Sequence, residues 1–318
     1  MRLLVVGGSK FVGRHVVEAA VADGHEVWLA NRGETTTETF GAAGRLTIDR
    51  ATDDLGALGG EAFDAVIDVS AYIPRHVTAL HDVLGDRVGW YLLVSTVSVY
   101  DAAAMADDPT ESAPRQLAEH DTEEVTSETY GPLKVACEEA AHQRWDDRLT
   151  VVRPGIVAGP HDHTDRFTWW VRHLATTRPT PLPDRRDQPV QVIDARDLAA
   201  FCLRLVADRT RGSFDATGEV LTLEALVDAV LDGVGGVTDE PVRWVDPSRW
   251  GEISLPPLVL DPSWGQDALF QRDSVAAPAA GLTRRPVSVT AEDTRAWDVA
   301  IGQPSLAAGP SAEELTAL

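Results

Sequence analysis

A tyrosine and a lysine stand four residues apart in the segment Tyr130-Gly131-Pro132-Leu133-Lys134. On an α-helix this spacing places the two side chains on one face, and a proline in the first turn does not break such a helix. A phenol with a pKa of about 10 is a poor proton relay at neutral pH, but a neighbouring ammonium lowers that pKa by favouring the phenolate. Lysine is also rare here, since Lys10 and Lys134 are the only lysines among 28 basic residues. The pair therefore predicts acid–base chemistry.

A hydroxyl donor should lie beside such a tyrosine, and an apolar run supplies three candidates. The segment 92–100 reads as a buried strand that ends in Ser95, Thr96 and Ser98 before Tyr100. The alternative interpretation is that these hydroxyls only cap loop backbone.

The chain begins with a strand that leads into a glycine turn. Residues 3–6 run into Gly7-Gly8-Ser9-Lys10-Phe11-Val12-Gly13, and a helix is expected to follow. This context is typical of a dinucleotide-binding turn. Gly7 would allow the tight turn, Gly8 the approach of backbone to a pyrophosphate, and Gly13 close packing of helix and strand. An ordinary strand-to-helix turn is the alternative, because Lys10 stands where the G-x-x-G-x-x-G form has glycine.

The end of the second strand bears on the choice of cofactor. An acid there would hold the ribose 2′-hydroxyl of NAD, but this chain has the neutral Asn31 followed by Arg32. Arginine can accommodate a 2′-phosphate, and Lys10 adds a second cation. The sequence therefore favours NADP over NAD, unless both cations are solvated surface charges.

The order of elements predicts the fold class. Expected strands at 3–6, 26–30, 46–48, 65–68, 90–94 and 150–152 alternate with helical stretches such as 13–23 and 75–84. This alternation predicts an α/β fold, a doubly wound parallel sheet with helices on both faces. A further strand is expected at 190–193, with helices at 197–206 and 223–231. The acidic segment 101–127 is long for a loop, which is typical of functional or mobile segments.

We expect two domains and a tail. Residues 1–155, with 190–213 returning to them, would bind the dinucleotide, and 156–189 with 214–302 would form a smaller C-terminal substrate domain. Residues 303–318 are small and polar and are expected to be a flexible tail.

The charge and the apolar content of the chain limit the kinds of partner that it can bind. The formal charge of −22 weighs against nucleic acid and membrane surfaces, and no run approaches the roughly 20 apolar residues of a membrane span. Two cysteines exclude a disulfide framework and fit a reducing cytoplasm, where we expect the protein. The expected partners are a small polar substrate and, in a homodimer, a second copy of the chain.

Five motifs stand in a fixed order: the Gly7–Gly13 turn, the Ser95–Tyr100 run, Tyr130-x-x-x-Lys134, Arg153-Pro154-Gly155-Ile156-Val157-Ala158-Gly159-Pro160 and Asp194-Ala195-Arg196-Asp197-Leu198. Together they resemble the extended short-chain dehydrogenase/reductase family, also called the NAD-dependent epimerase/dehydratase family. The turn resembles a divergent GGxxFxG branch that includes chloroplast RNA-binding members. The resemblance implies a Rossmann-type sheet.

The resemblance also implies roles for individual residues. The catalytic set would be Thr96, with Ser95 as the alternative hydroxyl, Tyr130 and Lys134. Cofactor-binding residues would be Gly7, Gly8, Ser9, Lys10, Phe11, Val12, Gly13, Asn31, Arg32, Asp49, Ser70, Ser95, Tyr130, Lys134, Pro154, Gly155 and Val157, and substrate-facing residues would be Ser98, His161 and Arg166.

The implied reaction is hydride transfer between NADP or NAD and a secondary alcohol or ketone of a polar metabolite, such as a sugar or nucleotide sugar. An epimerase with a retained NAD is the first alternative, and a non-catalytic nucleic-acid or regulatory binder is the second. Val97 and Ser98 replace the acid–base pair of the family's dehydratases, so elimination of water is not expected. His161-Asp162-His163 with Asp165 could suggest a metal, but nothing else completes a ligand set, and we expect none.

Overall fold

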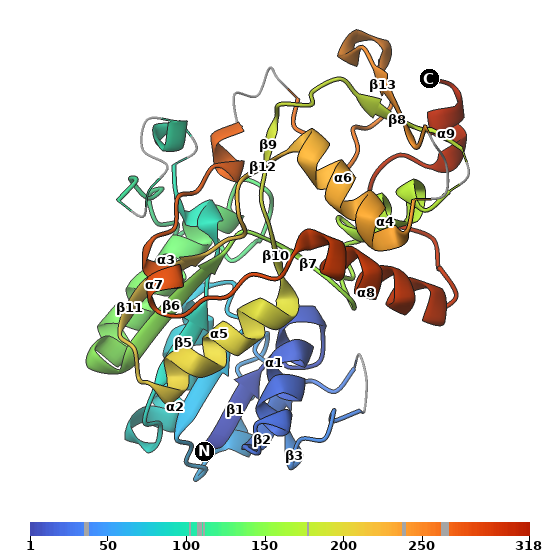
Figure 1. The fold of residues 1–318 in the computed structure, drawn as a ribbon. Helices are drawn as coiled ribbons and strands as arrows, with labels where there is room; N and C mark the ends of the chain where they lie inside the picture. The colour runs from blue at the N-terminus through green and yellow to red at the C-terminus, as the bar shows by residue number, and fades with distance from the viewer. Residues whose placement is uncertain are drawn as a thin grey trace. The chain divides into compact units, whose positions relative to one another are not determined.

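The computed structural model describes residues 1–34, 38–101, 103–106, 110, 112–176, 178–236, 240–261 and 267–318. Its centre is a seven-stranded sheet in the order β11-β6-β5-β4-β1-β2-β3, in which every paired strand is parallel (Figure 1). The strands are β1 (Arg2–Val6), β2 (Glu26–Asn31), β3 (Gly44–Thr47), β4 (Ala65–Asp68), β5 (Tyr91–Val94), β6 (Leu149–Pro154) and β11 (Gly212–Ala216). The expected doubly wound α/β fold is confirmed.

Apolar side chains on both faces of each central strand explain why the sheet is covered on both sides. Helices α2 (Pro74–Leu84) and α3 (Tyr130–Trp145) pack on the face that carries Leu4 and Val6 of β1. On the other face, α1 (Phe11–Ala22) brings Val17 close to Val5 at the first glycine turn. Helix α5 (Ala195–Ala207) packs on β11 through an edge-to-face pair of phenylalanines. Because parallel strands end at one edge, their following loops gather there.

The chain divides into two compact units. Unit 1 comprises residues 1–155, 196–217 and 273–283, and unit 2 comprises 156–195, 218–272 and 284–318. Unit 1 also contains α7 (Ala276–Ala279). Unit 2 contains β7 (Ile156–Ala158), β8 (Thr180–Pro183), β9 (Pro189–Val190), β10 (Val192–Asp194), β12 (Leu221–Thr222) and β13 (Val242–Val245), with helices α4 (Thr168–Leu174), α6 (Leu223–Val234), α8 (Val287–Ala300) and α9 (Ala312–Thr316). Its three small sheets pair β10 with β7, β12 with β9 and β13 with β8.

Short 3-10 turns connect several of these elements. They are η1 (Gly56–Leu58), η2 (Gly85–Arg87), η3 (Val97–Val99), η4 (Ala104–Ala106), η5 (Asp146–Arg148), η6 (Pro247–Arg249) and η8 (Asp267–Phe270). The turn η3 directly follows β5 and packs against α3.

Several expected elements differ from the structure. The single strand expected at 190–193 is two strands, β9 and β10, which pair with different partners in unit 2. Residues 214–217 and 273–283 belong to unit 1, because β11 completes its sheet and α7 packs on β11. Residues 190–195, expected to return to the dinucleotide domain, belong to unit 2, because β10 pairs with β7 and β9 with β12. The flexible tail expected at 303–318 instead packs on unit 2. Trp169 donates to the Pro310 carbonyl at 2.9 Å, and Leu315 and Leu318 are buried in the apolar core of unit 2. The substrate-binding role of unit 2 stays a prediction.

Among the described residues, the helices are all too short or too polar to cross a bilayer.

Candidate active site

The glycine turn between β1 and α1 is too crowded for side chains. Gly7 has a φ of +86°, and a Cβ there would lie 2.7 Å from the Cβ of Ser70. A Cβ on Gly13 would lie 2.5 Å from the Gly7 carbonyl oxygen, and one on Gly8 would lie 2.9 Å from Val17. Gly8 therefore permits close packing of the turn between α1 and β1, and Gly13 permits close packing of α1 on the turn that follows β1. The turn places backbone where a phosphate can approach it.

The N-terminus of α1 is open to an anion. Lys10 occupies the N-cap, and its side chain caps no backbone N–H of the helix. The first N–H groups of a helix lack intrahelical partners, so those at residues 12 and 13 can bind phosphate oxygens. Ser9, which donates its N–H to the Gly7 carbonyl, completes the turn.

At the end of β2, one buried donor has no partner. The Asn31 Oδ1 accepts from the Gly33 N–H at 2.9 Å, but Asn31 Nδ2 is buried without a hydrogen-bond partner in the described part of the chain. A ribose hydroxyl or a phosphate oxygen would satisfy that donor, and buried polar groups are normally satisfied. The Arg32 guanidinium is exposed and lies 3.2 Å from the Glu34 carboxylate. The adenosine end of a dinucleotide therefore fits this strand end.

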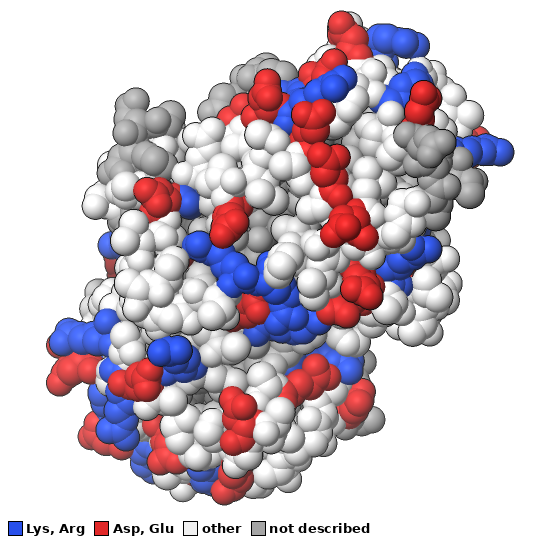
Figure 2. Space-filling view, viewed as in Figure 1, with Lys and Arg blue, Asp and Glu red and all other residues white. Residues whose placement is uncertain are grey.

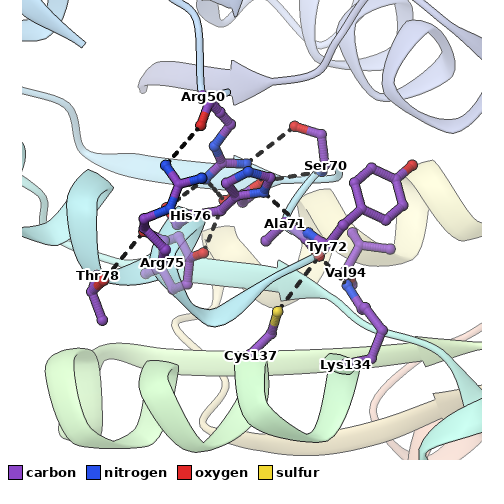
Figure 3. Close-up of polar contacts among 12 residues, drawn as sticks. Arg50, Ser70, Ala71, Tyr72, Arg75, His76, Thr78, Val94, Lys134 and Cys137 are labelled. Atoms are coloured by element: carbon purple, nitrogen blue, oxygen red, sulfur yellow. Dashed lines mark hydrogen bonds and ion pairs between the residues drawn. The ribbon is translucent and has the colours of Figure 1, made fainter. Parts of the chain in front are cut away.

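A buried ion pair ties the loop after β3 to the loop after β4 (Figure 3). Arg50 donates to both carboxylate oxygens of Asp68, at 2.8 and 2.6 Å, and to the hydroxyl of Ser70 at 3.2 Å. The pair lowers the pKa of Asp68 against the opposing effect of its complete burial. Asp49, the neighbour of Arg50, is held by two backbone hydrogen bonds with Asp54. Of the two predicted cofactor residues, Ser70 is thus positioned by the Arg50 guanidinium, and Asp49 by the backbone of Asp54.

Lys134 joins the ends of two strands. Its side chain is 3% exposed, and Nζ donates to the carbonyl oxygens of Ala71, after β4, and Val94, the last residue of β5. The distances are 2.7 and 2.9 Å. In Figure 3 the contacts from Lys134 and from the Cys137 thiol meet at the Ala71 carbonyl. Since an ammonium has three donors, one remains beyond these two bonds.

Tyr130 is the first residue of α3, so the proline two residues later falls in the tolerated first turn. Thr96 is the N-cap of the turn η3 and is buried; its Oγ1 accepts from the Ser98 N–H at 3.1 Å and donates to the Ser98 hydroxyl at 3.2 Å. Gly131 lets the two segments meet, because a Cβ there would lie 2.4 Å from the Ser98 carbonyl oxygen. The hydroxyl turn and the start of α3 are therefore neighbours. Ser95 is buried and lies beside Glu138.

A second tyrosine was missed in the sequence. Tyr72 follows the anchored residue Ala71, and its ring centroid lies 6.0 Å from Lys134 Nζ. Removal of solvent by the surrounding protein raises the pKa of the Tyr72 phenol, the nearby Tyr130 raises it further, and Lys134 opposes both. No sequence motif marks this position; only the rarity of tyrosine, with four in the chain, is a signal.

A buried charge network under α3 was also missed. Arg153 on β6 forms a two-pronged pair with Glu138 on α3, at 2.9 and 2.7 Å, and donates to the Tyr100 hydroxyl at 2.7 Å. Tyr100 in turn donates to Asp215 on β11 at 2.9 Å. Because Glu138 is one helical turn beyond Lys134, the network fixes the rotation of the helix that carries the site. The available signal was a charged residue inside the apolar strand 149–154.

The remaining predicted residues divide between the two units. Pro154 ends β6 and Gly155 donates its N–H to the Ala216 carbonyl, both in unit 1. Val157, His161 and Arg166 belong to unit 2: Val157 is buried in β7, the His161 ring lies 5.3 Å from that of Trp297, and Arg166 Nε donates to Thr164 Oγ1 at 3.1 Å. No group of three or more potential metal ligands occurs among the residues that the structure describes.

Comparison with known proteins now identifies the family. A model of the NAD dependent epimerase/dehydratase family matches residues 3–215, which is more than half of the chain. The chain belongs to this family. The finer assignment to a GGxxFxG branch stays a prediction.

Two curated relatives of this chain have different described functions, one in RNA binding and one in reduction. The chain is 24% identical over 261 residues to the chloroplast stem-loop binding protein of 41 kDa b from Arabidopsis thaliana, covering 76% of this chain and 66% of the relative. It is 29% identical over 224 residues to 2′-dehydrokanamycin reductase from Streptomyces kanamyceticus, covering 67% of this chain and 60% of the relative. The chain thus spans less than two thirds of either relative's length.

Among solved structures, the enzyme WbmH from Bordetella bronchiseptica in complex with NAD+ superposes with a TM-score of 0.69 at 17% identity. The match covers 95% of this chain and 99% of WbmH, and it shows the shared fold.

The site of this family member fits an NAD-type cofactor. The open α1 N-terminus and the glycine turn would hold the diphosphate, and the unpaired Asn31 donor would hold the adenosine ribose. When bound, the nicotinamide accepts or donates a hydride. The ammonium of Lys134 would place a positive charge beside Tyr130, and Thr96 presents a hydroxyl next to the start of α3.

Proposed function

We propose that the chain is an NAD(P)-dependent oxidoreductase that transfers a hydride between nicotinamide and a secondary alcohol or ketone of a polar metabolite. The observation that carries the proposal is the buried Lys134, one helical turn after Tyr130, at the meeting point of β4 and β5. A fixed ammonium there favours the phenolate of Tyr130 and so equips it to pass a proton. Thr96 would hydrogen-bond the substrate oxygen.

The charge of the chain supports a neutral or cationic substrate. At −22 the protein repels anions over its surface as a whole, and a nucleotide sugar would need a local arginine cluster. Among the predicted substrate residues, Arg166 is the single arginine, and it already donates to Thr164. The resemblance to 2′-dehydrokanamycin reductase supports a ketone on an amino sugar.

NADP is the proposed cofactor. Support comes from Asn31 and Arg32 at the end of β2, in place of the acid that would hold a free ribose 2′-hydroxyl, and from Lys10 at the N-cap of α1. A cofactor drawn from the NADPH pool is exchanged in each cycle, so we propose a reductase and keep the NAD-retaining epimerase as the runner-up.

The deciding experiment compares wild type with Tyr130→Phe. Turnover is followed by loss of the NADPH absorbance at about 340 nm, with 2′-dehydrokanamycin and other keto sugars as substrates. Tyr130→Phe should retain its fold and cofactor affinity but lose ~10²-fold or more in kcat. Turnover within a few-fold of wild type would remove Tyr130 from the mechanism. Tightly bound NAD after purification, with a sugar isomerised and no net change in absorbance, would favour the epimerase.

A nucleic-acid binder is the second candidate, favoured by the similarity to the chloroplast stem-loop binding protein. Its physical support is weak, since a basic stripe is the usual footprint of such binding. On the face shown in Figure 2, basic side chains gather near the middle but have acidic ones directly beside them, and the chain as a whole carries a charge of −22. Retention of a stem-loop RNA that falls steeply with salt, together with no cofactor turnover, would support the binder.

A further inference from the structure

Three residues of the loop that follows β4, Ser70 to Tyr72, span the distance between the glycine turn and the Lys134 side chain. At one end, Ser70 is so close to Gly7 that a Cβ on the glycine would lie 2.7 Å from the serine Cβ. At the other end, the Ala71 carbonyl accepts from Lys134 and the Tyr72 ring centroid lies 6.0 Å from Lys134 Nζ. Successive Cα atoms lie 3.8 Å apart, so Ser70 and Tyr72 are separated by about 7 Å.

This loop is held rigidly by its backbone and by buried partners. Arg50 donates to the Ser70 hydroxyl and to the His76 carbonyl, and the Tyr72 N–H donates to His76 Nδ1 at 3.3 Å. Burial lowers the pKa of His76 to about 4, so the imidazole is neutral near pH 7 and Nδ1 is free to accept. The position of Tyr72 is thus fixed from its backbone.

The side chain of Tyr72 nevertheless stays open. It is 46% exposed, whereas Tyr91 and Tyr100 are buried. In Figure 3 its ring stands beside the Lys134 side chain, apart from the cluster around Arg50. The loop does not need this ring for its own anchoring, since the anchoring contacts come from backbone groups and from Ser70 and Lys134. A large aromatic held open beside a buried ammonium is a ready contact surface for a ligand.

We propose that Tyr72 is a positioning residue for the nicotinamide riboside half of the cofactor. The inference rests on the proposed function. A dinucleotide whose diphosphate lies at the Gly7 turn follows the loop from Ser70 towards Lys134, and its nicotinamide half reaches Tyr72. The ring covers that half, next to the Lys134 ammonium, which the protein itself already shields from water. The phenol stays protonated and takes no part in proton transfer, which belongs to Tyr130.

Two nucleotides separate this role from a general effect on the fold. NADP+ carries the nicotinamide riboside half, and 2′,5′-ADP carries only the adenosine half. Tyr72→Ala should weaken NADP+ binding ~5–10-fold and leave 2′,5′-ADP binding within twofold of wild type. Tyr72→Phe keeps the ring and should restore NADP+ affinity. Val275→Ala, another exposed apolar side chain of unit 1, is the matched control and should change neither affinity.

Nitration with tetranitromethane tests the same contact in the unaltered protein. Tyr72 is the most exposed of the four tyrosines, and peptide mass spectrometry reports each one separately. Saturating NADP+ should slow nitration of Tyr72 at least ~5-fold, and saturating 2′,5′-ADP should not. Equal protection by both nucleotides, or no protection by NADP+, would overturn the inference. If neither nucleotide binds, the proposed function fails as well. If Tyr130→Phe loses turnover but the Tyr72 variants bind NADP+ as wild type does, the inference fails and the proposed function stands.

Discussion

The ammonium of Lys134 lies 2.7 Å from the carbonyl oxygen of Ala71, a residue 63 positions earlier in the chain. The same nitrogen bonds the Val94 carbonyl, so one cation joins the loop after β4 to the end of β5. The lysine that the sequence predicts to act through its charge beside Tyr130 therefore also holds two segments of the fold together. Replacing it should lower both the stability and the activity of the protein.

Lys134→Met should lower the free energy of unfolding by about 2–4 kcal/mol, because two buried carbonyl oxygens lose a charged donor. Urea unfolding followed by circular dichroism measures the change. Lys10→Met is the matched control, since Lys10 is the other lysine of the chain and is exposed; its stability should stay near that of wild type. Equal stability of the two variants would show that the carbonyl contacts contribute nothing.

The sequence predicts the parts of this site that depend on local structure. The spacing of Tyr130 and Lys134 needs only a helix, and the glycine turn needs only a strand followed by a helix, so both motifs point to their elements. The parallel pairing of the strands follows from the alternation of elements, because parallel strands need crossover helices.

The missed parts depend on contacts between distant segments. Arg50 meets Asp68 across 18 residues, and Tyr100 meets Asp215 across 115. Nothing in either local sequence names the partner, since a charged side chain at a strand end can equally face solvent. Tyr72 belongs to no motif, and its place beside Lys134 is set by the anchored loop. The small sheets of unit 2 were missed because their strands are only two to four residues long.

Removing one partner of the ion pair between Glu138 and Arg153 should strongly destabilise the fold. Glu138→Leu alone should cost about 3–5 kcal/mol, because it leaves the buried Arg153 guanidinium without a carboxylate. Arg153→Met should cost less, because Glu138 keeps its second cation, Arg115, at 3.0 Å. The double variant should cost less than the sum of the two, which a double-mutant cycle in urea measures. Additive effects would mean that the two side chains stabilise the fold independently.

His76 should make stability fall in mild acid. Its folded pKa of about 4 lies below the ordinary value near 6.5, so between these pH values the unfolded chain binds a proton that the folded chain does not. Stability present near pH 7 is therefore lost as the pH falls from 6.5 towards 4.

His76→Asn keeps an acceptor for the Tyr72 N–H and removes this titration. Between pH 7 and pH 5 its Tm should fall by about 2–4 °C less than that of wild type. Since His142 and His173 also have lowered pKa values, the difference between variant and wild type is the informative quantity. His120→Asn, at an exposed position, should behave as wild type. An unchanged pH profile in His76→Asn would contradict the role of His76.

The last prediction concerns the choice between NADPH and NADH. Wild type should bind NADPH more tightly than NADH, and Arg32→Ala should weaken NADPH ~10-fold without changing NADH, because only NADPH places a phosphate near that guanidinium. Glu34 lies 3.2 Å from Arg32, so its carboxylate competes for the same cation. Glu34→Gln should therefore tighten NADPH binding ~2–3-fold, the opposite of the arginine variant. Fluorescence titration of both nucleotides decides the matter. If NADH binds better than NADPH and neither variant changes either affinity, Arg32 is a surface charge and the cofactor is NAD.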